Sequence, residues 1–189
     1  MKLLKPFRIL WQRLTQQGLR TTFWWAMDHA VRIITGAPIE RVGRVTPQLY
    51  VGGQYRRRGW RRLEVRGVTA VVNMRVEFDD AAAGIAPARY LHLPTVDDEA
   101  PTLENLRLGS EFIAEEIERG GVVYVHCAAG IGRAAIMAAA YLVTTGLSAD
   151  EAWAHIRLGR PFIRPTPPQI EQLKRFAEVE RSETVAAKV

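Results

Sequence analysis

The fold is decided by one stretch of the chain, Val122-Val123-Tyr124-Val125-His126-Cys127-Ala128-Ala129-Gly130-Ile131-Gly132-Arg133. Its Val-rich first half predicts a short central strand over residues 122–126. Its second half is a tight loop with two glycines. The Ala-rich, apolar segment 133–145 then predicts a helix that packs closely against a sheet. A strand, a tight loop and a helix in this order are typical of an α/β fold.

The loop has the residue types of an anion-binding nest. Its glycines let successive backbone N–H groups turn inward without Cβ clashes, and the following helix adds its positive N-terminal end. The planar guanidinium of Arg133 can hold two phosphate oxygens at once. We therefore expect the loop to bind phosphate through Ala128, Ala129, Gly130, Ile131, Gly132 and Arg133.

Cys127 is the only cysteine of the 189 residues, which excludes an intramolecular disulfide and a Cys-rich zinc site. A lone cysteine is most often a small buried apolar side chain. Here the positive field of the loop favours the thiolate instead. We expect Cys127 to attack the phosphorus atom of a bound phosphate monoester. No metal or cofactor is expected, because Arg133 and the nest supply the positive charge.

The spacing of His126, Cys127, Gly130 and Arg133 follows the pattern His-Cys-x-x-Gly-x-x-Arg, which resembles the signature of the protein tyrosine phosphatase superfamily. The resemblance covers about residues 43–180, the size of the small dual-specificity branch. It implies a phosphocysteine intermediate on Cys127 and phosphate binding by Arg133. It also implies that His126 supports the loop and the thiolate by hydrogen bonding without touching substrate.

Cleavage of a phosphate ester also needs a proton for the leaving oxygen. The resemblance implies an Asp on a loop about 30 residues before the cysteine. Asp97 occupies that position in the acidic loop 94–101 and is the expected general acid, with Asp98 as the alternative. The Thr-Val-Asp and Pro-Thr-Leu spacing in this loop is similar to the lipid-directed dual-specificity phosphatase of mitochondria.

Ala134 departs from the pattern of the family, which usually has Ser or Thr directly after the arginine. That hydroxyl helps the thiolate to leave when the intermediate is hydrolysed. The regenerating-liver phosphatases, which the chain resembles at this position, also carry Ala. We therefore expect an active enzyme in which the phosphocysteine breaks down slowly.

The rest of the chain predicts an α/β fold with a central, mostly parallel sheet of four to five strands flanked by helices. The resemblance implies that this is the cysteine-phosphatase fold. A β-branched run predicts a strand over 68–74, and two further short strands are predicted over 48–51 and 90–93. Helices are predicted over 54–66, 102–119 with Thr102 as N-cap, from Ser148 with a capping box to Glu151, and from about residue 167.

We predict three parts: a basic, amphipathic helical arm over residues 1–40, a catalytic domain over 41–182 and a flexible tail over 183–189. The arm consists of two helical pieces separated near Gly18, and residues 1–35 carry six basic residues against one acidic residue, Asp28. Two interpretations of residues 1–35 stay open. The segment lies at a membrane interface, with aromatic side chains and cations facing anionic lipid, or it packs on the catalytic body or on a second subunit.

Three functions remain open. The first is a protein phosphatase for phosphotyrosine, with phosphoserine or phosphothreonine as further substrates. The second hydrolyses a lipid or another small phosphate monoester, such as phosphatidylglycerol phosphate. Ala128 and Ile131 weigh against polyanionic inositol lipids, whose phosphatases usually carry basic residues at these positions. The third is a phosphate-binding pseudophosphatase.

We expect a cytoplasmic protein with peripheral membrane association left open. No stretch reaches the roughly 18 apolar residues of a spanning helix. Outside the arm the basic and acidic residues nearly balance, which argues against nucleic acid as a partner.

Overall fold

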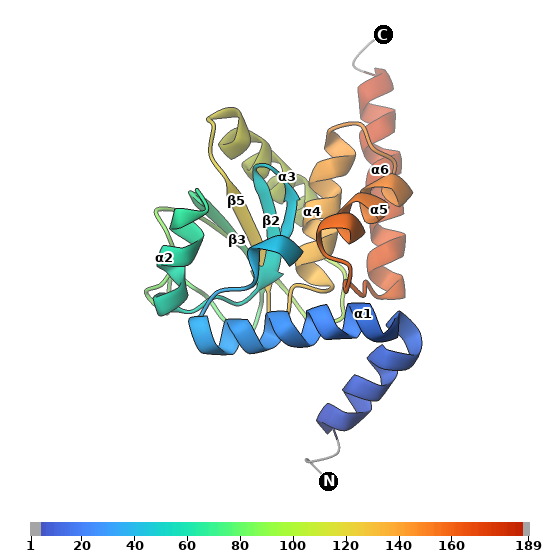
Figure 1. Cartoon of the computed structure of the whole chain (residues 1–189). Coiled ribbons are helices and arrows are strands. Elements are labelled where there is room, and N and C mark those ends of the chain that lie inside the picture. Colours follow the sequence, from blue (N-terminus) through green and yellow to red (C-terminus); the bar gives the residue numbers. More distant parts are fainter. Residues whose placement is uncertain (1–4, 187–189) are drawn as a thin grey trace.

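Five strands form one central sheet in the computed structural model, and helices cover both of its faces (Figure 1). The structure describes residues 5–186, and for residues 5–13, 184 and 185 it describes only the backbone. The strand order is β1-β2-β5-β3-β4, with parallel pairing except between β1 and β2. The mostly parallel sheet of four to five strands is therefore confirmed. The strands are β1 (Arg44–Thr46), β2 (Leu49–Gly53), β3 (Ala70–Arg75), β4 (Arg89–Thr95) and β5 (Val123–Cys127).

The helices begin near the residues that the sequence predicts. The Thr102 hydroxyl accepts from the Asn105 amide at 3.1 Å, and Ser148 forms the predicted capping box with Glu151. The last helix runs to Ala186, so the backbone of residues 183–186 is helical, and residues 187–189 lie outside the described part. The predicted flexible tail over 183–189 stays a prediction. The helices are α1 (Lys5–Thr35), α2 (Arg57–Val65), α3 (Leu103–Glu118), α4 (Arg133–Thr144), α5 (Ala149–Gly159) and α6 (Pro167–Ala186).

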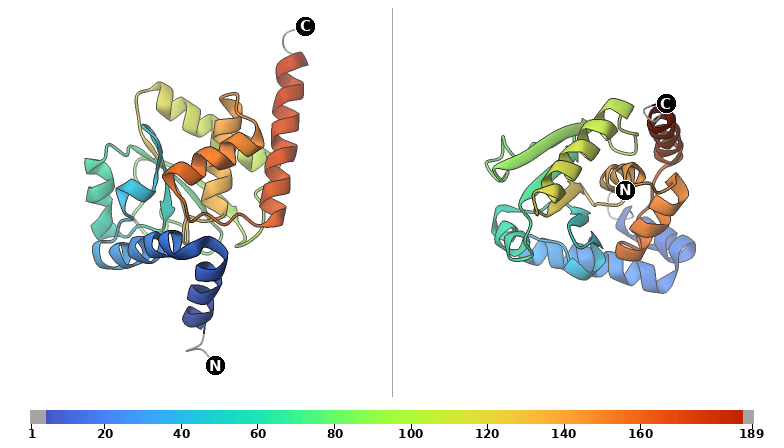
Figure 2. Two further views of the ribbon diagram at one scale, coloured as in Figure 1. Left: turned by 45° about the vertical axis from the view of Figure 1, so that its right-hand side comes forward. Right: turned by 90° about the horizontal axis from the view of Figure 1, so that it is seen from above.

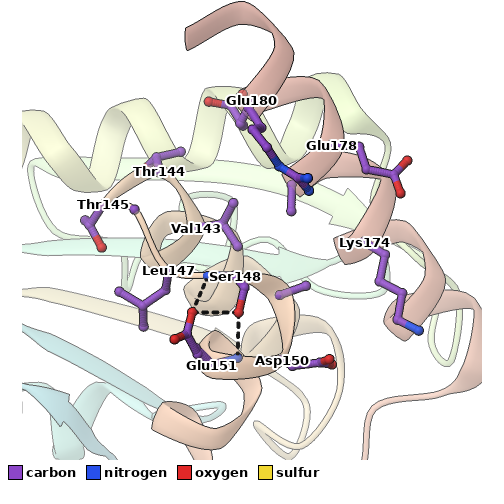
Figure 3. Close-up of a pocket in the computed structure, with 14 residues that line it drawn as sticks. Val143, Thr144, Thr145, Leu147, Ser148, Asp150, Glu151, Lys174, Glu178 and Glu180 are labelled. Carbon is purple, nitrogen blue, oxygen red and sulfur yellow. Dashed lines mark hydrogen bonds between the residues drawn. The ribbon is translucent and has the colours of Figure 1, made fainter. Parts of the chain in front are cut away.

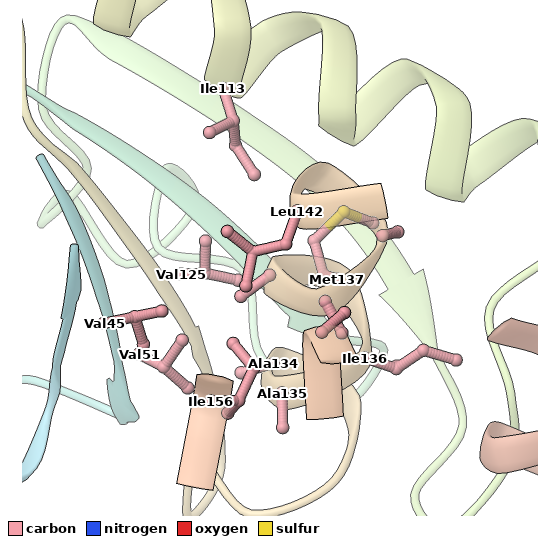
Figure 4. Packing of buried hydrophobic residues seen from close by; sticks show 14 of the residues in the cluster. Val45, Val51, Ile113, Val125, Ala134, Ala135, Ile136, Met137, Leu142 and Ile156 are labelled. Atoms are coloured by element: carbon pink, nitrogen blue, oxygen red, sulfur yellow. The ribbon is translucent and has the colours of Figure 1, made fainter. Parts of the chain in front are cut away.

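Helix α4 is the centre of the larger hydrophobic core (Figure 4). Every residue from Arg133 to Ala140 is buried, and most of them are alanines. Small side chains let the helix approach the sheet closely, since protein interiors pack without voids. The side chains around α4 include Val51 and Val125 of the sheet and Ile113 of α3. A smaller core on the opposite face packs α2 against the sheet.

Helix α1 has a sharp bend at Gly18, where φ is +78° and the backbone is not helical. The predicted separation of two helical pieces near Gly18 is therefore confirmed. The second piece lies across the edge of the sheet at which β5 ends, and the first points away from the body (Figures 1 and 2). Residues 19–35 thus pack on the catalytic body, in agreement with one of the two interpretations of the arm. The predicted domain boundary at residue 40 stays a prediction.

The arginine-rich segment of α2 is mostly solvated. The side chains of Arg57, Arg61 and Arg62 are exposed, whereas Arg66 is half-buried and donates to the Pro38 carbonyl at 2.8 Å. Within residues 5–186, none of the helices combines the length and the hydropathy that crossing a membrane requires.

Candidate active site

The loop between β5 and α4 has a backbone that only glycine fits at its centre. Gly130 has φ of +67°, a conformation that costs other residues energy. A Cβ atom at this position would overlap the backbone of Gly52 in the neighbouring strand. The Gly130 amide donates to the Cys127 sulfur at 3.2 Å, so the loop curls over the end of β5.

The carbonyl groups of the loop all point away from its centre. Each carbonyl accepts a hydrogen bond from a donor on the outer side of the loop. In a peptide plane the N–H points opposite to the carbonyl, so the N–H groups of these planes point inward. The amides of Ala129, Ile131 and Gly132 accordingly have no protein acceptor among the described residues. Residues 129–133 therefore have the inward amides of a nest, and their binding of phosphate stays a prediction. The donors are Gln54 N and Arg32 Nη1 to Ala128, Arg160 to Ala129 and Gly130, Arg164 N to Ile131 and Ile136 N to Gly132.

Arg133 is buried, and its two terminal nitrogens make three hydrogen bonds and an ion pair. Nη1 donates to Glu77 Oε2 and to the Thr95 carbonyl, both at 2.8 Å. Nη2 lies 2.9 Å from Glu77 Oε1 and 2.9 Å from Asp97 Oδ1. Burial lowers the pKa of Arg133, but hydrogen bonding to Glu77 and the charges of Cys127 and Asp97 raise it above its ordinary value. The Nε–H has no partner in the described part of the chain.

The free Nε–H and one N–H of the Nη2 group, which lies close to Asp97, are adjacent donors on the guanidinium. A fork of two parallel N–H groups matches two oxygens of a phosphate. The Asp97 carboxylate therefore lies close to one of the two donors that a bound dianion would use. Its side chain is 73% exposed and can swing aside, whereas the Glu77 and Thr95 contacts can persist.

Of the two acid candidates, the structure brings Asp97 and not Asp98 to Arg133. Asp98 has φ of +64°, and its carbonyl accepts from the Thr166 hydroxyl at 2.8 Å. This bond fixes the loop to the segment before α6. Gln169, in the first turn of α6, donates to the Glu99 carbonyl at 2.9 Å. The acidic loop is thus held in place by the two residues directly after Asp97, whose own side chain is exposed.

His126 makes a different contact from the expected one. Its Nε2 lies 2.7 Å from Asp80 Oδ2, and both side chains are fully buried. Its Nδ1 has no partner among the described residues, so the hydrogen bond to the loop that the resemblance implies is not found. A buried carboxylate needs donors, and Asp80 obtains them from His126 and from Gln54 Nε2 at 2.8 Å.

Glu77 and Asp80 were missed by the sequence reasoning. Both follow β3, which lies beside β5 in the sheet and runs parallel to it. Ligands bind at the carboxyl ends of such strands, so polar residues directly after β3 were the available signal. Hydrogen bonding to Arg133 lowers the pKa of Glu77 to about 2, and Glu77 is therefore ionised at neutral pH.

A surface hollow of about 780 Å³ lies at the opposite end of α4 (Figure 3). It is lined by the connection between α4 and α5 and by one face of α6. Ser148 and Glu151 point into it, but they hydrogen-bond to each other as the cap of α5. Because these groups are engaged in the helix cap, we assign no chemistry to this hollow.

Comparison with known proteins agrees with this geometry. The family model described as "Dual specificity phosphatase, catalytic domain" matches residues 49–179. Dual specificity protein phosphatase 14 of Mus musculus is 31% identical over 142 residues, which is 72% of this chain and 69% of that protein. Dual specificity protein phosphatase 1 of Homo sapiens is 30% identical over 143 residues. This match covers 75% of this chain but only 37% of that protein.

The chain is also similar in sequence to a phosphatase that is named for a lipid substrate. Phosphatidylglycerophosphatase and protein-tyrosine phosphatase 1 of Homo sapiens is 43% identical over 88 residues, 46% of this chain and 44% of that protein. The crystal structure of PTPMT1 in complex with PI(5)P has a TM-score of 0.69 at 32% identity. It covers 75% of this chain and 97% of the PTPMT1 chain.

Proposed function

This chain belongs to the dual specificity phosphatase family and is a cysteine-dependent phosphatase, and from that premise we propose that its residues 127–133, with Asp97, hydrolyse phosphate monoesters of proteins. The observation that carries the proposal is the loop of inward amides around the Cys127 sulfur, which ends at Arg133 with its unpartnered Nε–H. Phosphotyrosine is the proposed main substrate, with phosphoserine and phosphothreonine as further ones.

The proposed reaction has two steps. The Cys127 thiolate attacks phosphorus, an S–P bond forms, and the bond from phosphorus to the ester oxygen breaks. Asp97 gives its proton to that oxygen, and the alcohol or phenol leaves. Water then attacks the phosphocysteine and Asp97 takes up its proton. Inorganic phosphate leaves and the thiolate is restored.

The loop and Arg133 would bind the phosphoryl oxygens throughout this cycle. The amides of residues 129–133 point to the space in which the charge develops, and preorganised donors of this kind stabilise a transition state strongly. When substrate binds, Asp97 would leave the Nη2–H of Arg133 to the phosphate and move to the leaving oxygen. Glu77 would hold the other side of the guanidinium in place.

A lipid phosphate monoester is the alternative substrate. Similarity to the phosphatidylglycerophosphatase named above supports it. Ala128 and Ile131 bring no cation to the loop, which favours a headgroup with a single phosphate over a polyanionic one. The third reading, a phosphate-binding pseudophosphatase, is disfavoured by the intact Cys127 and Arg133.

Hydrolysis of a small aryl phosphate tests the proposed reaction. We expect turnover that vanadate inhibits and that Cys127→Ser abolishes, and Asp97→Asn should lower kcat about 100-fold or more. A folded wild-type protein without turnover would overturn the proposal in favour of the pseudophosphatase. Rates on phosphopeptides, phosphatidylglycerol phosphate and inositol lipids would then separate the protein and lipid substrates.

We further propose peripheral contact between α1 and an anionic membrane in a cytoplasmic setting. The outward face of α1 supports this proposal, because an apolar stripe on it is exposed to solvent. Its members recur at spacings of three and four residues, as on one face of a helix. We define the stripe as Leu19, Phe23, Met27, Ala30 and Ile34.

A further inference from the structure

The inward face of α1 carries two charged side chains. Asp28 and Arg32 lie one helical turn apart, Asp28 is 3% exposed and Arg32 is half-buried. Buried charges cost free energy unless they are paired or hydrogen-bonded. An arm that only tethered the protein would not require charged residues such as Asp28 and Arg32 on its inward face.

Arg32 reaches the phosphate-binding loop directly. Its Nη1 donates to the Ala128 carbonyl at 2.9 Å and to the Gln54 carbonyl at 3.3 Å. Ala128 directly follows the nucleophile, and its carbonyl is the first of those that point out of the nest. Arg32 therefore fixes the peptide plane whose other end is the Ala129 amide.

Asp28 reaches the same loop through a second arginine. Its Oδ2 lies 3.2 Å from Arg160 Nη2, and its Oδ1 accepts from the Ile39 amide at 2.9 Å. Arg160 is fully buried and donates to the next two loop carbonyls, those of Ala129 and Gly130. The α1 helix thus contacts three successive carbonyls, one directly and two through Arg160.

These contacts also place charge behind the nest. Asp28 balances one of the two guanidinium groups, and the other remains as a positive charge on the outer side of the loop. Burial lowers the pKa of Arg32, and the charges of Tyr124, Asp28 and Cys127 oppose this shift. A half-buried cation next to the loop favours both a thiolate and a bound dianion.

We propose that Arg32, with Asp28, is a positioning residue of the active site, so that the N-terminal helix holds the phosphate-binding loop in its reactive shape. The proposal rests on the function proposed above and extends it to residues outside the matched region 49–179. The part of the chain that bears the apolar stripe on its outer face therefore also supports the catalytic loop on its inner face.

The test compares Arg32→Met with a matched control, Arg157→Met. Arg157 is an exposed arginine of α5. Three quantities are measured on the full chain: kcat/KM for an aryl phosphate, the rate at which iodoacetamide alkylates Cys127 at pH 6, and the vanadate concentration that protects against alkylation. For Arg32→Met we expect kcat/KM and the alkylation rate each to fall about tenfold, because the variant loses the charge-assisted hydrogen bond to the loop. The protecting vanadate concentration should rise by a similar factor.

Arg32→Lys keeps the charge and one donor, so it should recover part of each loss, and Arg157→Met should match the wild type. A merely structural role would lower Tm but leave the vanadate concentration and the alkylation rate of the folded protein unchanged. If Arg32→Met does not fold, Arg32→Gln replaces it; Gln is polar but too short to reach Ala128. A folded Arg32 variant with wild-type alkylation and vanadate protection overturns the proposal.

The alkylation arms do not require turnover. If the wild-type protein hydrolysed no phosphate monoester, the proposed function would fail, whereas alkylation and vanadate protection would still report on Arg32.

Discussion

Arg133 keeps its charge inside the protein, between the carboxylates of Glu77 and Asp97. The two acids differ in how they are held. Glu77 accepts hydrogen bonds from both terminal nitrogens of Arg133, whereas Asp97 forms an ion pair with one of them and is largely exposed. We infer that Glu77 is the lasting partner that orients the guanidinium and that Asp97 is the exchangeable one.

Replacing Glu77 by Gln should make stability less dependent on pH in the acid range. The folded pKa of about 2 lies below the ordinary value of 4.5, so the stabilisation is present above pH 4.5 and is lost as the pH falls toward 2. At pH 6 we expect Glu77→Gln to lower the free energy of unfolding by about 1.5 kcal/mol. This is the low end of the range for a hydrogen bond to a charged group, because Glu77 is partly exposed.

Thermal unfolding between pH 6 and pH 2 measures this difference. The Tm gap between wild type and variant should close as the pH falls. A gap that stays constant over this range would contradict the role of Glu77. The exposed Glu104→Gln on α3 serves as the matched control.

Ala134 bears on the second reaction step. Its methyl group is fully buried in the same apolar cluster as Cys127 and offers no hydrogen-bond donor to the sulfur. We expect Ala134→Ser to speed steady-state turnover of an aryl phosphate roughly three- to tenfold, the value of one hydrogen bond to the leaving thiolate. Rapid-mixing kinetics should show a smaller initial burst of product. An unchanged or lower rate in a folded variant would count against slow phosphocysteine breakdown.

At the scale of elements, α2 holds the end of α1 in place through two glycines. Gly36 ends α1 with φ of +82°, and a Cβ atom at Gly59 would overlap the Gly36 carbonyl group. The Arg56 amide also donates to the Gly36 carbonyl at 2.8 Å, and Arg58 donates to that of Ile33. The close contact between the two helices thus sets where the inward face of α1 meets the loop.

Gly59→Ala should separate these helices. The obstacle is backbone and not a flexible side chain, so we expect a loss of about 2 kcal/mol or more in the free energy of unfolding. Arg61→Ala, on the exposed side of the same helix, should change stability by less than about 0.5 kcal/mol. Urea unfolding of both variants checks this, and equal midpoints would refute the packing argument.

At the scale of the whole molecule, helix α1 contacts the loop 127–133 with its inward face and carries the apolar stripe on its outward face. The stripe leaves several large side chains in solvent, among them Phe23 at 58% exposed. Exposed contiguous apolar surface marks interaction sites. Insertion of this face into a lipid interface would bring the edge of the sheet that carries the loop close to the membrane (Figure 1).

Polar substitution in the stripe tests the membrane proposal. Leu19→Gln, Phe23→Gln and Met27→Gln combined should weaken binding to vesicles of anionic phospholipid at least tenfold, since each buried apolar side chain contributes about 1.5 kcal/mol or more. Co-sedimentation measures the binding. Val65→Gln with Leu158→Gln, which lie exposed on other helices, is the matched control. Equal binding of both variants would exclude the stripe as the contact surface.

What the sequence determined by itself was local in the chain: the strand, loop and helix around Cys127, the caps at Thr102 and Ser148, and the break at Gly18. These features depend on backbone preferences and on spacing within a few residues. The family pattern also pointed to Asp97, though its role and those of the loop residues stay predictions.

Only the tertiary structure decided which distant groups meet at the loop. Glu77 and Asp80 follow a different strand, and Arg32 lies 95 positions before Cys127, so no spacing rule relates them to the nucleophile. Their contacts arise because the buried guanidinium of Arg133, the imidazole of His126 and the outward carbonyls of the loop each require a partner away from water. These partners reach the loop only when the sheet and α1 have packed together in the folded protein.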